Sequence, residues 1–264
     1  MSFFIRITGL YIFLSFSTMA FCYSKEGDAV SYNGQKVRGF YVHIVQVNLN
    51  SSIIKVTPAV VRGFSDSQGY YPARSFSSFI DYYKPTAAIN GTFFDTVTYK
   101  PVGTIVIGGK FVNNGYIGTA VCVDKENQVT FHHVSGQQGS KIDWSPFESV
   151  ICSGPTLVTE GDVILNPADE GFQDPAVYSQ NRRSAIGITA YNKLLLVTVE
   201  SKVFLRTLAY IMKDLGCLYA VNLDGGTSSA LYYKGKYLTY TSRVMSSVIL
   251  VYENKKKIKV ENFR

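Results

Sequence analysis

The sequence predicts a single α+β domain with strand-rich mixed sheets, two main helices and an active cleft at the ends of strands. Three observations support this class. The 264 residues are enough to bury one large core. The 19 Tyr and 17 Phe residues, together with many Val and Ile, favour strands over helices. Only two segments carry apolar residues at helical spacing, and we find neither an internal repeat nor a linker.

The first half of the chain predicts paired strands around one short helix. Residues 38–47 and 52–60 are expected to form a hairpin, and 101–112 a second hairpin with Gly108 and Gly109 at its tip. Residues 75–83 are expected to be helical because apolar side chains recur at helical spacing, and Pro85 ends the segment. Residues 86–90 then read as a buried strand that runs into a polar turn.

The second half predicts three more strand regions and the longer helix. Residues 149–158 form a strand broken at Gly154-Pro155, and residues 161–183 a long polar loop or lid. Leu205, Leu208, Ala209, Met212 and Leu215 mark the helix, which Gly216 ends. The remaining strands are a hairpin of 184–189 with 194–199, a strand from 219, and a last strand over 246–252.

The two ends of the chain differ from its body. Residues 1–22 are interpreted as a secretory signal peptide, because Arg6 precedes a short apolar run that ends near Ala20. An uncleaved anchor is the alternative. Residues 23–254 form the domain, and residues 255–264 a basic tail. We therefore expect an exported protein, located in a periplasm, at the cell surface or outside the cell, with no stable membrane span after cleavage of the leader.

Export implies an oxidising compartment. Cys122, Cys152 and Cys217 permit one disulfide and one buried thiol, but their spacing does not select a pair. The formal charge of +7 is concentrated at the ends, since the leader carries one positive charge and the tail a net four. The body is close to neutral, which argues against a nucleic-acid partner.

The most informative segment is 219–229, Tyr-Ala-Val-Asn-Leu-Asp-Gly-Gly-Thr-Ser-Ser. An apolar strand stops at Asp224, and two glycines and three hydroxyl residues follow. This order places a carboxylate at a strand end and lets a ligand approach bare backbone. A simple hairpin turn is the competing interpretation. Similar combinations at Asn90-Gly91, at 153–155 and at 182–183 predict one cleft lined by strand ends.

These segments resemble the phosphodiester glycosidase family. The similarity lies in five blocks, which occur in family order between Ala88 and Ser228. One departure is Thr92, where the family usually has a second glycine. The blocks are Ala-Ile-Asn-Gly-Thr-Phe-Phe at 88–94, Pro-Val-Gly at 101–103, Ser-Gly-Pro-Thr-Leu at 153–157, Arg-Ser-Ala-Ile-Gly at 183–187 and Ala-Val-Asn-Leu-Asp-Gly-Gly-Thr-Ser at 220–228.

The resemblance implies hydrolysis of a glycosyl-1-phosphodiester, which releases free sugar and a phosphomonoester. Asp224 is then expected to act as nucleophile or base. Arg183 is expected to stabilise the departing phosphate, because a guanidinium binds phosphate through two parallel hydrogen bonds. Glu200 is the candidate second carboxylate, with a charge at the start of a helix as its alternative role.

The expected substrate-binding residues surround these three. Asn222 alternates with Asp224 along the strand and so shares its face. The full set is Asn90, Gly91, Asp95, Gly154, Asn222, Gly225, Gly226, Thr227 and Ser228.

We expect chemistry without a metal or another cofactor. His132 and His133 are neighbours in a strand, so they point to opposite faces and cannot share an ion. A Ca²⁺ ion held by Asp95 and Asp224 is the alternative, because carboxylate oxygens suit this cation. The expected partner is a small glycosyl phosphate or an envelope glycan, and the oligomeric state stays open.

Two other functions compete with the hydrolase. The first is a non-catalytic glycan-binding envelope protein of the same fold. The second is a phosphodiesterase that breaks the P–O bond. Retention of the whole segment around Asp224 favours the hydrolase, because binding alone tolerates loss of the acid.

Overall fold

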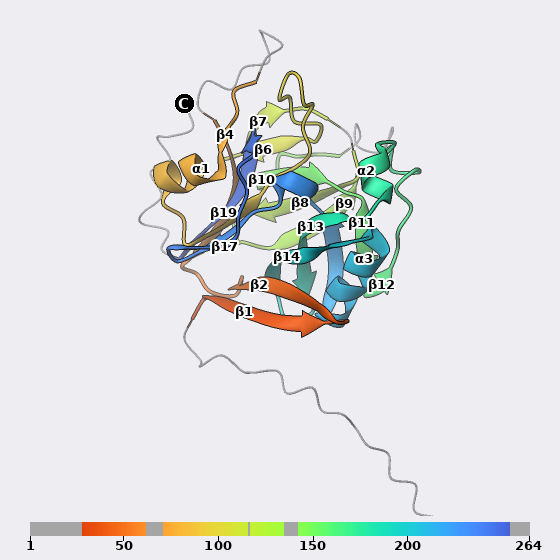
Figure 1. Ribbon diagram of the computed structural model, residues 1–264. Helices are drawn as coiled ribbons and strands as arrows, with labels where there is room; N and C mark the ends of the chain where they lie inside the picture. The colour runs from red at the N-terminus through yellow and green to blue at the C-terminus, as the bar shows by residue number, and fades with distance from the viewer. Residues whose placement is uncertain (1–27, 62–70, 116, 135–141, 254–264) are drawn as a thin grey trace, which may run out of the picture.

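The computed structural model describes residues 28–61, 71–115, 117–134 and 142–253 (Figure 1). The leader over 1–22 and the tail over 255–264, both predicted from sequence, lie outside these residues. Within the described residues, three large sheets and a two-stranded ribbon pack as one domain.

The largest sheet has seven strands in the order β1-β2-β14-β13-β15-β11-β12. It holds the strand that leads to Asp224, which is β15. The bounds are β1 Val30–Val37, β2 Phe40–Asn48, β11 Thr156–Thr159, β12 Asp162–Val163, β13 Asn181–Thr189, β14 Lys193–Val203 and β15 Cys217–Asn222.

Two five-stranded sheets and the ribbon complete the strands. One sheet has the order β7-β6-β10-β8-β9, with β6 Ile105–Ile107, β7 Lys110–Asn113, β8 Thr119–Asp124, β9 Val129–His133 and β10 Phe147–Ser153. The other has the order β17-β16-β5-β19-β3, with β3 Ile54–Val60, β5 Ala87–Asn90, β16 Leu231–Tyr233, β17 Lys236–Thr239 and β19 Ser247–Glu253. The ribbon pairs β4 Arg74–Ser75 with β18 Val244–Met245.

The two predicted main helices are confirmed. Helix α1, Phe76–Tyr83, begins after Ser75, whose side chain accepts a hydrogen bond from the Ser78 N–H. Helix α3, Leu205–Asp214, buries one apolar face, and Gly216 follows it at a φ of +82°. A short helix α2, Pro175–Tyr178, lies inside the expected polar loop and is capped by Asp174. A 3₁₀ turn, η3, spans Gly226–Ser228.

The expectation of mixed sheets is corrected. Every pairing between the described strands is antiparallel. Helix α3 joins β14 to β15, and these two strands run in the same direction. However, β13 lies between them, so the crossover creates no parallel neighbours.

One predicted hairpin is also wrong. β2 and β3 follow one another in the chain but lie in different sheets, because β2 pairs with β1 and β14, whereas β3 pairs with β19. Both strands are largely buried, so their best partners are the central strands of two packed sheets. The hairpins β6–β7 and β13–β14 are confirmed, as is the break between β10 and β11 at Gly154-Pro155.

The main core lies where the three large sheets meet. Ile89, Ile151, Ile186, Leu196 and Ile249 come from all three sheets and are buried together there. The outer face of the seven-stranded sheet is covered by α3 (Figure 1) and by the segment around Phe172 and Val177. Helix α1 covers the outer face of the sheet that contains β5.

Cys122, Cys152 and Cys217 are buried free thiols, so the disulfide that the sequence permitted is not formed. Burial raises the pKa of the Cys152 and Cys217 thiols to about 12. None of the helices in the described residues is long and apolar enough to cross a membrane.

Candidate functional site

Asp224 lies where the seven-stranded sheet meets the sheet of β5. The Leu223 N–H donates to the Ser184 carbonyl at 2.9 Å, which continues the pairing with β13. The next N–H, that of Asp224, donates instead to the Gly91 carbonyl at 3.2 Å, directly after β5. The main chain of this acid is therefore held by both sheets.

Asn90 completes this attachment. Its Nδ2 donates to the Asp224 carbonyl at 2.7 Å, and its Oδ1 accepts from the Ala230 N–H at 3.1 Å. The neighbouring Gly91 leaves no space for a side chain, because a Cβ would lie 2.7 Å from the Ser247 carbonyl oxygen. Both residues were expected to bind substrate, and both contact the backbone around Asp224.

Asn222 connects the site to Gly154, which follows the end of β10. It is fully buried, and its Nδ2 donates to the carbonyls of Gly154 at 2.9 Å and Leu223 at 2.7 Å. Its Oδ1 has no hydrogen-bond partner among the described residues. Gly154 is packed against the Phe172 ring, which would lie 2.8 Å from a Cβ at this position.

The turn after Asp224 places a backbone donor at its carboxylate. The Gly225 N–H donates to Asp224 Oδ1 at 2.8 Å. Gly226 adopts a φ of +60°, which favours glycine. Thr227 is exposed and Ser228 is buried.

Burial raises the pKa of Asp224 to about 6. Three groups favour the ionised form and limit the rise of this pKa: the Ser228 hydroxyl, the Arg243 cation and the Gly225 N–H. The negative charge of Asp174 adds to it. A carboxylate that titrates near neutral pH can exchange protons with a reacting water.

Asp174 and Arg243 were missed by sequence reasoning. Asp174 caps α2, where its Oδ1 accepts from the Ala176 N–H at 2.8 Å. Arg243 Nη1 donates to Thr227 Oγ1 at 3.2 Å, and its guanidinium lies 5.2 Å from the centre of the Phe94 ring. The Asp174-Pro175 pair is a helix-start signal, whereas Arg243 lies in an irregular segment without any motif.

Arg183 lies beside this turn, as expected, but most of its donors are already engaged. Nη2 donates to the carbonyls of Ala176, Val177 and Ser179, and Nε to that of Val203, at 2.6 to 3.3 Å. Nη1 lies beside the turn, since a Cβ on Gly225 would be 3.7 Å from it. Burial lowers the pKa of Arg183 to about 10, which leaves it charged at neutral pH.

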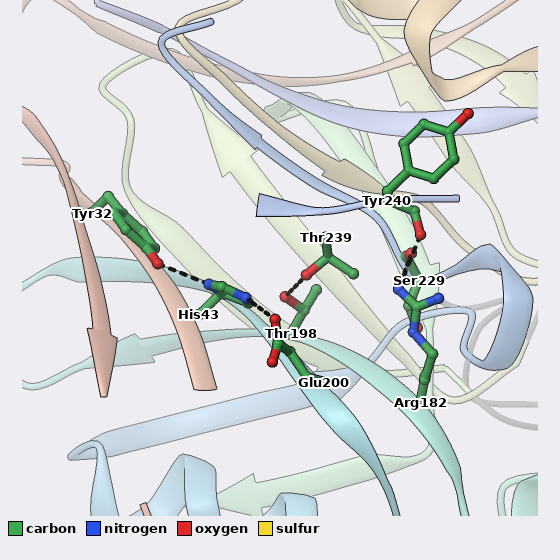
Figure 2. Close-up of polar contacts among 8 residues, drawn as sticks. All are labelled: Tyr32, His43, Arg182, Thr198, Glu200, Ser229, Thr239 and Tyr240. Atoms are coloured by element: carbon green, nitrogen blue, oxygen red, sulfur yellow. Dashed lines mark hydrogen bonds and ion pairs between the residues drawn. The ribbon is translucent and has the colours of Figure 1, made fainter. Parts of the chain in front are cut away.

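Glu200 lies on the other face of the sheet. Val199 pairs with Arg183, so the next residue along β14 points to the opposite side. Figure 2 shows Glu200 beside His43, whose Nε2 is 2.8 Å from Glu200 Oε1, while the His43 Nδ1 contacts the Tyr32 hydroxyl at 2.8 Å. The structure thus brings Glu200 together with His43 rather than with Asp224.

Asp95 is exposed, and its carboxylate closes a local turn. Oδ1 accepts from the N–H groups of Val97 and Thr98 and from the Thr98 hydroxyl. These hydrogen bonds hold the pKa of Asp95 below its usual value. In the described part of the chain, no group of three or more His, Cys, Asp or Glu side chains is arranged to hold a metal ion.

The cleft itself stays a prediction. Two cavities among the described residues, one near α1 and one between α2 and α3, are lined by other residues. What the described residues establish is a half-buried acid at a strand end, with Arg183 beside the turn that follows it and with the charges of Arg243 and Asp174 acting on its pKa in opposite directions.

Comparison with known proteins places the chain in a family. The phosphodiester glycosidase family model matches residues 83–252. Bovine N-acetylglucosamine-1-phosphodiester alpha-N-acetylglucosaminidase is 23% identical over 195 residues, which are 64% of this chain and 37% of the bovine protein. The chain thus matches little more than a third of that relative's length.

Solved structures share the fold. The catalytic domain of the zebrafish enzyme of the same name, auto-inhibited by its pro-peptide, superposes with a TM-score of 0.68 at 22% identity, covering 87% of this chain and 85% of that one. A hypothetical protein from Synechocystis gives a TM-score of 0.73 at 18% identity, with 84% and 61% covered. A family match over more than half of the chain, with this fold beside it, shows that the chain belongs to the phosphodiester glycosidase family.

Proposed function

We propose that this protein is an exported hydrolase that cleaves a sugar from a glycosyl-1-phosphodiester. Water adds its hydroxyl to C1, the C1–O bond breaks, and the phosphate oxygen leaves as a phosphomonoester. The single observation that carries the proposal is the setting of Asp224, whose pKa is raised to about 6 at a strand end beside Arg243.

Asp224 acts as the base in this proposal. With a pKa near 6 it is mostly ionised at neutral pH, yet far more basic than an ordinary aspartate. The Gly225 N–H holds one carboxylate oxygen at 2.8 Å, and the other accepts the proton of the attacking water.

The leaving group needs a cation more than an acid. The second pKa of a phosphomonoester is about 6, so its oxygen departs without prior protonation. Arg243 supplies the positive charge, because it is only half-buried and, among the described residues, its guanidinium donates to one side chain, that of Thr227. Arg183 supports it through Nη1, while its other donors keep α2 in place.

Asp174 is the second carboxylate of this site. Its charge raises the pKa of Asp224, so the two groups are close enough to interact electrostatically. It takes the part first expected of Glu200, whose contact is with His43.

Hydrolysis in heavy-oxygen water tests the reaction. N-acetylglucosamine-1-phosphodiesters are the first substrates to try, because the bovine relative is named for them. Label in the released sugar supports cleavage of C1–O, whereas label in the phosphate identifies the P–O phosphodiesterase instead.

Two variants separate catalysis from binding. Asp224→Asn is expected to lower kcat at least about a hundredfold, since general-base catalysis contributes about 10²- to 10⁴-fold. Asp162→Asn, at an exposed ion pair with Lys213, is the matched control. Full turnover by Asp224→Asn contradicts the assignment, and a tight glycan ligand without turnover in the wild type favours the binding protein.

A further inference from the structure

Glu170 is a buried acid that the proposed mechanism does not use. It is only 5% exposed and lies within residues 161–183, the segment predicted from sequence as a long polar loop or lid. Burial raises the pKa of its carboxyl above the ordinary value. Hydrogen bonds from Thr156 and the nearby His133 limit this rise, whereas the charge of Asp169 adds to it. Because a buried carboxylate is costly unless hydrogen bonds satisfy it, its partners show what the residue holds.

Glu170 binds Thr156, the first residue of β11. Both carboxylate oxygens accept from the Thr156 N–H at 3.0 Å, and Oε2 also accepts from the Thr156 hydroxyl at 2.9 Å. The Thr156 Oγ1 lies 2.7 Å from the Oγ1 of Thr119, the first residue of β8. Glu170 therefore ties its loop to the seven-stranded sheet and, through Thr119, to the sheet of β8.

Two carbonyls just before Thr156 hold Asn222, the last residue of β15. The carbonyl of Gly154 accepts from Asn222 Nδ2 at 2.9 Å, and that of Pro155 accepts from the Asn222 N–H at 3.0 Å. Asn222 lies two residues before Asp224. The buried carboxylate therefore fixes, through Thr156, the backbone that holds the end of β15.

The loop that carries Glu170 continues to α2, on the other flank of the proposed site. Phe172 packs against the turn before β11. Asp174 then caps α2, and its charge raises the pKa of Asp224. Two carbonyls of α2 accept from Arg183 Nη2. Anchoring this loop therefore keeps the charge of Asp174 in place relative to Asp224.

We propose that Glu170 is a positioning residue, which holds the predicted lid against the start of β11 and thereby places the groups around Asp224. It contacts no substrate in this role. Its effect on hydrolysis rests on the proposed function, whereas its effect on the titration of Asp224 does not. The two competing interpretations are a direct effect of the Glu170 charge and an anchor that matters for stability alone.

Two variants test the anchor. Glu170→Ala removes the acceptors of Thr156. Glu170→Gln can keep the attachment, because its amide oxygen accepts from the Thr156 N–H and its NH₂ donates to the Thr156 hydroxyl, which then donates to Thr119. The matched control is Asn127→Gly, in the turn between β8 and β9. It removes another buried polar side chain, whose Nδ2 donates to the Ile54 carbonyl at 2.7 Å, and glycine suits the φ of +61° at this position.

The pKa of Asp224 is measured by carbon-13 NMR of the aspartate carboxyl groups in the intact protein, and Asp224→Asn identifies the signal. Glu170→Ala should lower this pKa, because a released loop admits water and carries the charge of Asp174 away. The kcat for a glycosyl-1-phosphodiester should fall at least about tenfold, since a misplacement of about 1 Å can cost about a hundredfold. Both quantities should stay at the wild-type value in Glu170→Gln and in Asn127→Gly.

Three results overturn the proposal. An unchanged pKa of Asp224 in Glu170→Ala shows an anchor that matters for stability alone. Equal changes in Glu170→Gln and Glu170→Ala assign the effect to the charge itself, and equal changes in Asn127→Gly assign it to lost stability. If Glu170→Ala does not fold, Thr156→Val takes its place, since it removes the hydroxyl bond, keeps the N–H bond and should also lower the pKa of Asp224.

A wild type that hydrolyses no phosphodiester contradicts the proposed function. The NMR titration then decides the role of Glu170 by itself, because the pKa of Asp224 is measured without any substrate.

Discussion

Replacing Asp224 with Asn should stabilise the protein at neutral pH while lowering the proposed hydrolysis at least about a hundredfold. The pKa of this acid rises from 3.8 to about 6 on folding, because burial disfavours the charged form. This rise corresponds to about 3 kcal/mol by which the ionised carboxylate destabilises the folded state. Asparagine has nearly the same shape and can keep the bond from the Gly225 N–H, yet it carries no charge.

The sign of the pH dependence follows from linkage. A carboxyl group whose folded pKa is raised favours the folded state when it is protonated, and this advantage is lost as pH rises from about 4 through about 6. The free energy of unfolding of Asp224→Asn should exceed that of the wild type by about 3 kcal/mol at pH 7.5 and by about 0.6 kcal/mol at pH 4.

Urea unfolding of both proteins at the two pH values measures this difference directly. Other titrating groups are common to both proteins and cancel in the comparison. Equal stability at pH 7.5, or a gain that does not depend on pH, refutes the electrostatic reasoning.

Three further predictions concern neighbouring residues. Arg243→Gln should raise the pKa of Asp224 and shift the acid limb of the pH–rate profile upward, whereas Asp174→Asn should shift it downward. Shifts in the same direction would contradict the opposite signs of these two charges. Asn90→Ala leaves a buried carbonyl and a buried N–H without partners, so urea unfolding should show a loss of about 2–4 kcal/mol. Arg183→Lys cannot reach all four carbonyls and should lower the melting temperature by at least about 4 °C, which calorimetry checks; an unchanged value would show that these bonds contribute little.

Local sequence signals predicted the elements well. Apolar side chains at helical spacing located α1 and α3, and Pro85 and Gly216 marked where these helices end, because such signals act within a few residues. Gly108-Gly109 located the β6–β7 hairpin for the same reason. The pairing of β3 with β19 joins residues almost two hundred positions apart, and no turn signal can specify such a contact.

The site was predictable where a motif surrounds the residue. Asp224 and Arg183 lie together because β15 pairs with β13, and both lie in recognisable blocks. Arg243 comes from an irregular segment, and its position depends on the packing of Phe94 and Thr227 rather than on a pattern. Glu200 was placed near Asp224 from its position in the sequence, but the alternation of side chains along β14 turns it toward His43.

The attachment of Asp224 through Asn90 and Gly91 makes the position of the proposed catalytic acid depend on completion of folding. Asp224 follows β15 of the seven-stranded sheet, but its N–H and carbonyl are hydrogen-bonded to Gly91 and Asn90, at the end of β5 in another sheet. An intermediate with only one sheet formed would leave this loop without its anchor, so its carboxylate would be solvated and weakly basic. Recovery of hydrolysis during refolding would therefore report when the seven-stranded sheet and the sheet of β5 associate.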